Sequence, residues 1–192
     1  DLPMMGEAFQ AGGYRTGLFG KWHLGYNRPH LPMDRGFDEA LYFLGFGLTG
    51  MGHYWESDYF DPFVYWNGDL TQIQGYCNDI WFDEAMTWMS EQDAPFFCYL
   101  ATNLPHFPEW LDESYSQAYD DSDAPDFFGK IANIDENLGK LEAFLMAKGL
   151  REDTILIFMS DNGGVHTNIY NAGMTGGKCT RTEGGHRVPC FI

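Results

Sequence analysis

Three segments of the chain place apolar residues at the spacing of one helix face. Residues 3–11 predict a short helix that ends at a glycine pair, and residues 78–92 predict a second helix with Asn78 as its N-cap. The longest helix is predicted over 125–148, with a proline in its first turn and a glycine just beyond its end. Its inner stripe is expected to be apolar and to comprise Ile131, Ile134, Leu138, Leu141 and Leu145.

Short apolar runs lie between these helices and predict strands. Residues 14–19 and 96–101 each form one such run. The run over 154–159 is nearly unbroken, which is typical of a strand at the centre of a sheet covered on both faces. The aromatic stretch 39–70 predicts strands and loops, with Asn67-Gly68 as a hairpin turn. Because helices and strands alternate, the pattern predicts an α/β fold.

Polar residues follow each of the three predicted strands at its C-terminal end. These clusters lie at residues 21–23, 103–106 and 160–162. In open α/β sheets, ligands bind at the edge formed by the C-terminal ends of the strands. The pattern therefore predicts a functional site that combines the three clusters.

Asp161 and Asn162 offer one carboxylate and one amide oxygen, followed by two glycines. Hard cations such as calcium prefer oxygen ligands, usually six to eight of them. Two residues do not complete such a shell, and the chain contains no compact acidic cluster that would supply the rest. The alternative is that Asp161 and Asn162 only form a turn.

Lys21 and His23 lie two residues apart between glycines, so in an extended segment both side chains point the same way. Such a pair can bind an anion and move a proton. His106 lies in a stiff segment between prolines, which suits a general acid or an anion donor. Lys178 follows two glycines without the spacing of a phosphate-binding Walker loop. The alternatives are solvated surface side chains and, for His106, a histidine packed on neighbouring aromatic rings.

The composition restricts the class of partner. A formal net charge of −17 excludes nucleic acid and anionic membranes as favoured partners, and no apolar run reaches the length of a membrane span. The same charge repels anionic substrates, so an anion site must be built from local cations. The four cysteines show no C-x-x-C spacing, which favours structural thiols over a metal knuckle or a redox pair.

Four motifs together resemble the sulfatase family. They are G-K-W-H-L-G at 20–25, P-F-F-C-Y-L-A-T-N-L-P-H-F-P at 95–108, S-D-N-G-G at 160–164, and G-G-K with E-G-G-H-R-V-P between 176 and 189. The first and last are family signatures, and the order of all four matches the family. The motif-bearing stretches cover about half of the chain.

The resemblance implies an α/β/α sandwich with a mixed central sheet, of the alkaline-phosphatase-like type, that hydrolyses sulfate esters at one calcium ion. Asp161 and Asn162 would bind calcium, and Lys21 and Lys178 would bind the sulfate oxygens. His23 would contact a formylglycine nucleophile and act as a base. His106 would bind sulfate and protonate the leaving alcohol, a task for which Lys21 competes.

The chain also departs from the family pattern. No cysteine or serine stands in the C/S-x-P-S/T-x-R context from which a maturation enzyme makes formylglycine, and the family's paired calcium-binding aspartates are absent. We therefore expect residues 1–192 to be part of a sulfatase catalytic domain, incomplete at both ends, without the nucleophile segment and the C-terminal subdomain, and inactive alone.

The resemblance implies an exported protein, periplasmic, extracellular or lysosomal, that acts on a small-molecule or glycan sulfate ester. Two alternatives remain. One is a phosphomonoester, phosphodiester or phosphonate hydrolase of the same superfamily, because sulfate and phosphate are both tetrahedral oxyanions. The other is a non-catalytic relative that binds sulfated glycans. One or two rings of an aromatic segment are candidates for lining the substrate mouth, against the alternative that these rings pack in hairpins and core. The segment comprises Tyr54, Trp55, Tyr59, Phe60, Phe63, Tyr65 and Trp66.

Overall fold

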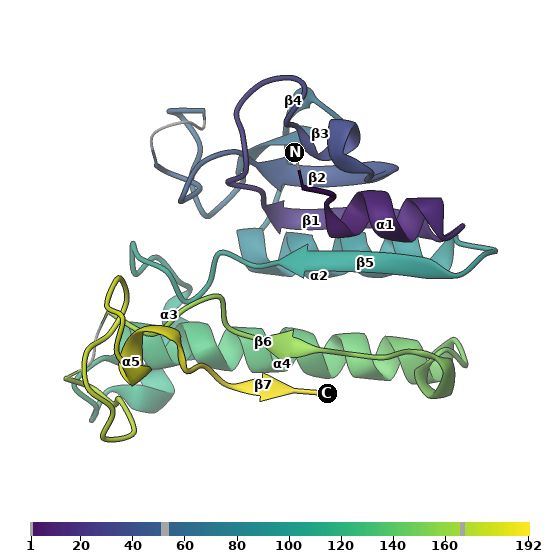
Figure 1. Cartoon of the computed structure of the whole chain (residues 1–192). Coiled ribbons are helices and arrows are strands. Elements are labelled where there is room, and N and C mark those ends of the chain that lie inside the picture. The colour runs from purple at the N-terminus through teal and green to yellow at the C-terminus, as the bar shows by residue number, and fades with distance from the viewer. Residues whose placement is uncertain (1, 51–53, 166–167) are drawn as a thin grey trace.

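The computed structural model describes residues 2–50, 54–165 and 168–192 (Figure 1). Its helices and strands, with three short 3-10 turns between them, are α1 (Met5–Ala11), β1 (Arg15–Lys21), β2 (Glu39–Phe43), β3 (Phe63–Trp66), β4 (Asp69–Gln72), α2 (Cys77–Ser90), β5 (Phe96–Ala101), α3 (Glu113–Ser116), α4 (Pro125–Ala147), β6 (Phe158–Met159), α5 (Glu183–His186) and β7 (Cys190–Phe191).

The central sheet is mixed, as the sequence predicts. Its strand order is β4-β3-β2-β1-β5. Strand β1 runs parallel to both β2 and β5, whereas β3 pairs antiparallel with β2 and with β4. Because β1 and β5 are parallel and pair up to Gly20 and Ala101, the two loops that follow them leave the sheet at the same edge.

Side chains of β1 and β2 point alternately to the two faces of the sheet, and both faces are covered by other residues. Leu18 and Tyr42 point to one face, where Phe9 of α1 stacks on Phe97 of β5 with ring centroids 4.1 Å apart. Phe19 and its neighbours in β2 point to the other face and pack against α2 and α4. Figure 1 shows α1 and α2 on opposite sides of the sheet. The layers therefore form the predicted α/β/α sandwich.

The predicted hairpin is confirmed. Asn67 and Gly68 connect β3 to β4, and both have positive φ angles, 50° and 101°. This is the backbone that a tight hairpin turn requires, and Asn and Gly adopt it most easily. The side chain of Asn67 also accepts a hydrogen bond of 2.8 Å from the backbone N–H of Ala40, which fixes the turn against β2.

The predicted N-cap of the second helix is wrong. Helix α2 begins at Cys77, with Tyr76 in the cap position, and Asn78 lies inside the first turn. Asn78 is fully buried, and its Nδ2 donates to Oδ1 of Asn133 on α4 at 2.8 Å. A side chain engaged with another helix does not serve as a cap, so tertiary contact overrides the local preference.

The inner face of α4 is more polar than predicted. Ile134, Leu141 and Leu145 are buried as expected, but Ile131 is 41% exposed. Polar side chains take part of that face, and Asn133 and Asn137 both donate to Asp79 Oδ1 on α2, at 2.9 and 2.7 Å. Since buried polar groups need partners, α2 and α4 are matched here by hydrogen bonding as well as by apolar packing.

The apolar run 154–159 is not a central strand in the described chain. Only Phe158–Met159 forms a strand, and β6 pairs with β7 in a separate two-stranded ladder. Ile155 is 81% and Ile157 53% exposed. Figure 1 shows β6 apart from β5. An apolar run indicates a strand covered on both faces, but it does not determine which strands pair with it.

No helix within residues 2–50, 54–165 and 168–192 is long and apolar enough to cross a membrane.

Candidate active site

Lys21 is placed by a close approach of two strands. Gly20, immediately before it, has a φ of +110°, and a Cβ at that position would lie 2.1 Å from the carbonyl oxygen of Ala101 on β5. Only glycine permits this approach. Lys21 therefore leaves the sheet directly beside the point where β5 ends, and its side chain is partly buried.

Trp22 and His23 continue this loop in opposite directions. Trp22 is buried, and its indole N–H donates to the carbonyl oxygen of His30 at 2.8 Å. His23 has a φ of 52° and an exposed side chain. A positive φ in a residue other than glycine is uncommon and marks a backbone held by its surroundings. Trp22 thus anchors the loop, and His23 is presented to solvent on the site side.

His106 follows β5 and has a defined tautomer. Its Nδ1 lies 2.7 Å from the carbonyl oxygen of Phe107, and the two rings are tilted by 32° with centroids 4.4 Å apart. A carbonyl oxygen only accepts, so Nδ1 carries the proton and donates it. Nε2 is then the ring atom available to a ligand. Because Nδ1 already carries a proton, Nε2 can act as the predicted proton donor only in the imidazolium form of the ring.

Asp161 and Asn162 lie in a loop that is joined to the segment around Lys178. The backbone N–H of Lys178 donates to Gly164 at 3.0 Å, and that of Gly163 donates to Gly185 at 3.1 Å. A Cβ at Gly163 would lie only 1.8 Å from the carbonyl oxygen of Gly184. The glycines of S-D-N-G-G and E-G-G are thus explained by backbone contact, which brings Lys178 beside the loop of Asp161.

Replacing Gly163 by alanine is expected to misalign this loop pair and lower kcat/KM of the full-length protein by about 10- to 100-fold, because small displacements of reacting groups are costly. The matched control is Gly139→Ala in α4, where an added Cβ meets nothing within 4 Å. Steady-state kinetics of both variants test this, and equal activities would contradict it.

Four of the six predicted residues form one electrostatic cluster. Burial lowers the pKa of Lys21, Lys178 lowers it further, and Asp161 opposes both effects. Burial also lowers the pKa of His23, with Lys21 and then Lys178 adding to the shift. Lys21, His23, Asp161 and Lys178 are therefore close enough to influence one another, although they come from three separate segments. Among the described residues, no hydrogen bond joins His106 to this cluster.

The cluster favours bound anions and a neutral His23. Two cations beside an imidazole disfavour its protonation, so His23 remains available as a base at neutral pH. We expect the pKa of His23 to rise in Lys178→Met, since one of the two charges that oppose imidazolium is removed. An NMR titration of the His23 ring measures this, with the exposed Lys148→Met as control. An unchanged or lower pKa in Lys178→Met would refute the described arrangement.

The residues present suit calcium in type but not in number. The carboxylate of Asp161 is exposed. Asn162 donates through Nδ2 to Gly163 at 3.1 Å, which leaves its Oδ1 for a cation. Within the described ranges, however, no group of three or more His, Cys, Asp or Glu side chains could hold a metal ion. The described residues therefore supply only part of the oxygen ligands that calcium needs.

Two of the four free cysteines are poor nucleophiles. Burial raises the pKa of the Cys77 and Cys98 thiols to about 12. Such thiols are protonated at neutral pH and therefore unreactive. The predicted role as structural thiols fits these two, whereas Cys179 and Cys190 are exposed.

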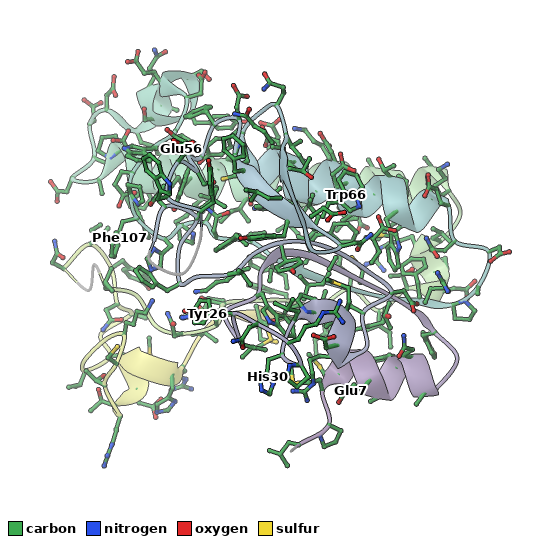
Figure 2. The ribbon with its side chains drawn as sticks, turned by 90° about the horizontal axis from the view of Figure 1, so that it is seen from above. Glu7, Tyr26, His30, Glu56, Trp66 and Phe107 are labelled. Atoms are coloured by element: carbon green, nitrogen blue, oxygen red, sulfur yellow. The ribbon has the colours of Figure 1, made fainter. Side chains whose placement is uncertain are left out.

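The two tryptophans among the aromatic candidates, Trp66 and Trp55, differ in their position relative to the site. The indole N–H of Trp66 donates to Glu39 at the beginning of β2, at 3.0 Å. Figure 2 shows Trp66 toward the opposite end of the sheet from Phe107, so Trp66 does not line the site. Trp55 is 81% exposed, and its role at a substrate mouth stays a prediction.

Two further side chains contact the His106 loop. One is Lys130, for which no motif predicts a role, and the other is Tyr59, one of the aromatic candidates for the substrate mouth. Lys130 of α4 and Tyr59 both donate hydrogen bonds to the carbonyl oxygen of His106, at 3.0 and 3.3 Å. One signal was present in the sequence. Lys130 stands one helical turn before Ile134, on the stripe that the helix pattern assigns to the interior.

Comparison with known proteins agrees with this geometry. A sequence model of the sulfatase family matches residues 1–192. The uncharacterized sulfatase YdeN of Escherichia coli (strain K12) is 28% identical over 97% of this chain and 38% of its own length. Arylsulfatase A of Homo sapiens is 28% identical over 96% of this chain and 41% of its own length. The chain thus spans about two fifths of the length of these curated relatives.

Solved structures give the same result. The crystal structure of Ps i-CgsB in complex with k-i-k-neocarrahexaose superposes with a TM-score of 0.88 at 28% identity, over 98% of this chain and 46% of that chain. A phosphonate monoester hydrolase of Agrobacterium radiobacter shares the fold, with a TM-score of 0.57 at 19% identity. From the family match over its whole length, together with the strand-end cluster, we conclude that this chain belongs to the sulfatase family.

Proposed function

We propose that the full-length protein containing this chain hydrolyses sulfate esters. The observation that carries the proposal is the cluster of Lys21, His23 and Lys178 around Asp161, in a chain whose overall charge is strongly negative. Cations concentrated at one edge of an otherwise acidic protein favour a small anion at that edge. Membership of the sulfatase family supports sulfate as that anion.

Lys21 and Lys178 are proposed to bind the nonbridging oxygens of the sulfate group. Both side chains are partly buried, so their charges are less screened than those of surface lysines. Charge that develops on these oxygens in the transition state would be stabilised by groups already in position. This is how the two lysines would accelerate the reaction rather than merely attract the substrate.

The two histidines are proposed to transfer protons, one as a base and one as an acid. His23, whose pKa is lowered by partial desolvation of its ring and by its cationic neighbours, would accept a proton from the nucleophile's hydroxyl. In its imidazolium form, His106 would bind sulfate and donate the Nε2 proton to the leaving alcohol, because Nδ1 is engaged by Phe107. Lys21 is the competing donor.

The proposal also includes calcium and formylglycine. Asp161 and Asn162 would supply two oxygen ligands to one calcium ion, and further ligands would come from residues beyond those described here. A formylglycine, made by a maturation enzyme from a cysteine or serine outside residues 1–192, would supply the hydrated aldehyde that attacks sulfur. Export to a periplasmic, extracellular or lysosomal compartment belongs to the same proposal.

A sulfated glycan is the proposed substrate class. The structural relative Ps i-CgsB was solved with k-i-k-neocarrahexaose, and the likeness covers 98% of this chain. To test the proposal, the full-length protein would be incubated with sulfated galactan oligosaccharides and with their desulfated counterparts, and free sulfate quantified by ion chromatography. Sulfate release that calcium chelation abolishes is expected. Binding of the oligosaccharides without release would favour a non-catalytic glycan-binding protein.

A further inference from the structure

Lys130 is an unusual buried cation. It lies on α4, its side chain is 0% exposed, and its pKa is lowered, mainly because burial disfavours the ammonium form. A buried ammonium is costly unless each of its three donors finds an acceptor. Its acceptors therefore indicate what this side chain does.

All acceptors of Lys130 belong to the loop that contains His106. Nζ donates to the carbonyl oxygens of Pro105 at 3.1 Å, His106 at 3.0 Å and Pro108 at 3.4 Å. The same ammonium also forms an ion pair with the carboxylate of Glu109. One side chain thus connects α4 to a run of five consecutive residues, 105–109.

Tyr59 holds the same loop from another segment. Its hydroxyl lies 3.3 Å from the carbonyl oxygen of His106 and 3.2 Å from that of Phe107. Tyr59 is fully buried, so the hydroxyl is fixed in place. The loop itself forms no strand ladder, because the structure places it after β5 as turns and irregular backbone.

The contacts reach the imidazole through the backbone. The His106 carbonyl is bound by both Lys130 and Tyr59, and the carbonyl that accepts from His106 Nδ1 is that of Phe107, which also contacts Tyr59. Moving either carbonyl would move the ring or break its hydrogen bond. The orientation of Nε2 therefore depends on these two buried side chains.

From this geometry we infer that Lys130 is a positioning residue for His106, a role that rests on the proposed sulfate-ester hydrolysis. It contacts no substrate. It fixes the loop from which His106 binds and protonates the leaving group, and Tyr59 acts as its second support. Small displacements of a catalytic group lower rates steeply, so this support matters for turnover more than for binding.

The test is Lys130→Met in the full-length protein, since methionine keeps the length of the side chain and removes its donors. We expect kcat to fall about 10- to 100-fold on esters of poorly leaving alcohols, with KM nearly unchanged. Leu141→Ala, buried on the same helix and without polar side-chain atoms that could bind the loop, is the control for lost stability and is expected to retain kcat. Tyr59→Phe is expected to show a smaller loss of kcat. It replaces Lys130→Met as the test variant if Lys130→Met does not fold.

A double-mutant cycle separates positioning from general damage. In a His106→Ala background, Lys130→Met is expected to lower kcat less than about threefold, because its effect passes through the missing imidazole. Equal losses in both backgrounds would overturn the inference.

Hydrogen–deuterium exchange of residues 103–110 tests, without any substrate, whether Lys130 stabilises the His106 loop. Faster exchange there in Lys130→Met than in Leu141→Ala is expected. Unchanged exchange of these residues in Lys130→Met would contradict the positioning role of Lys130, even if the wild-type protein releases sulfate. A wild-type protein that releases no sulfate, with faster exchange in the variant, would instead refute the proposed function alone.

Discussion

Lys21→Met in the full-length protein is expected to lower kcat for sulfate-ester hydrolysis by about 10²- to 10³-fold, which corresponds to about 3–4 kcal/mol of transition-state stabilisation. The physical reason is that the Lys21 charge is partly buried beside Lys178 and Asp161, where no solvent cation can replace it. Methionine preserves most of the apolar stem, so packing is little affected. Steady-state kinetics on a small aryl sulfate would measure the loss.

The control for Lys21→Met is Lys148→Met, which removes the same charge from an exposed position after α4. Its activity should equal that of the wild type, since surface charges are screened by salt and solvent. A loss below about tenfold in Lys21→Met would mean that this ammonium does not stabilise the transition state. The anion site would then have to be sought elsewhere.

His106→Ala is expected to have an effect that depends on the leaving group. For alkyl or sugar sulfates, whose alcohols leave poorly, we expect kcat to fall about 10²- to 10⁴-fold, the usual contribution of a general acid. For 4-nitrophenyl sulfate, whose phenolate leaves without a proton, the loss should be much smaller. The ratio of the two losses therefore measures proton donation by Nε2.

His30→Ala is the matched histidine control, because the His30 side chain is exposed and the contact to Trp22 uses its backbone carbonyl. It should leave both reactions unchanged. Equal losses for both ester types in His106→Ala would assign His106 to sulfate binding alone. Lys21 would then be the proton donor, and Lys21→Met should show the dependence on the leaving group instead.

The parts of the fold that the sequence predicts well are those fixed by local chemistry. The β3–β4 hairpin follows from Asn67-Gly68, and the ends of α4 follow from its proline and glycine signals. The edge where Lys21 and His106 emerge follows from two parallel strands. In the hairpin and at the ends of α4 a few neighbouring residues determine the backbone, whereas the common edge depends on the parallel pairing of β1 with β5.

The errors arise where distant segments meet. Asn78 is a poor guide to the start of α2 because its partner, Asn133, lies 55 positions away. The run 154–159 has the composition of a central strand, yet its pairing depends on neighbours that composition does not specify. Lys130 escapes pattern analysis for a related reason. Its function depends on carbonyl groups, which every residue has and no sequence motif marks.

In the candidate site, too, some features follow from sequence motifs and others depend on contacts between distant segments. Motifs identify Lys21, His23, Asp161 and Lys178, and the structure brings their three charged groups and the imidazole near one edge of the sheet. Their roles in catalysis stay predictions, as do the calcium ion and the nucleophile. The two backbone contacts at Gly20 and Gly163 explain why glycines flank these motifs, which motif matching alone leaves unexplained.

The most direct test of the central claim compares matched esters on one preparation of the full-length protein. kcat/KM would be measured for 4-nitrophenyl sulfate, 4-nitrophenyl phosphate and a 4-nitrophenyl phosphonate, which share a leaving group and differ in the transferred oxyanion. The account predicts that the sulfate is the preferred substrate and that Lys21→Met abolishes most of its turnover. Preferred turnover of the phosphate or the phosphonate would contradict it and assign the site to the related phosphoryl chemistry.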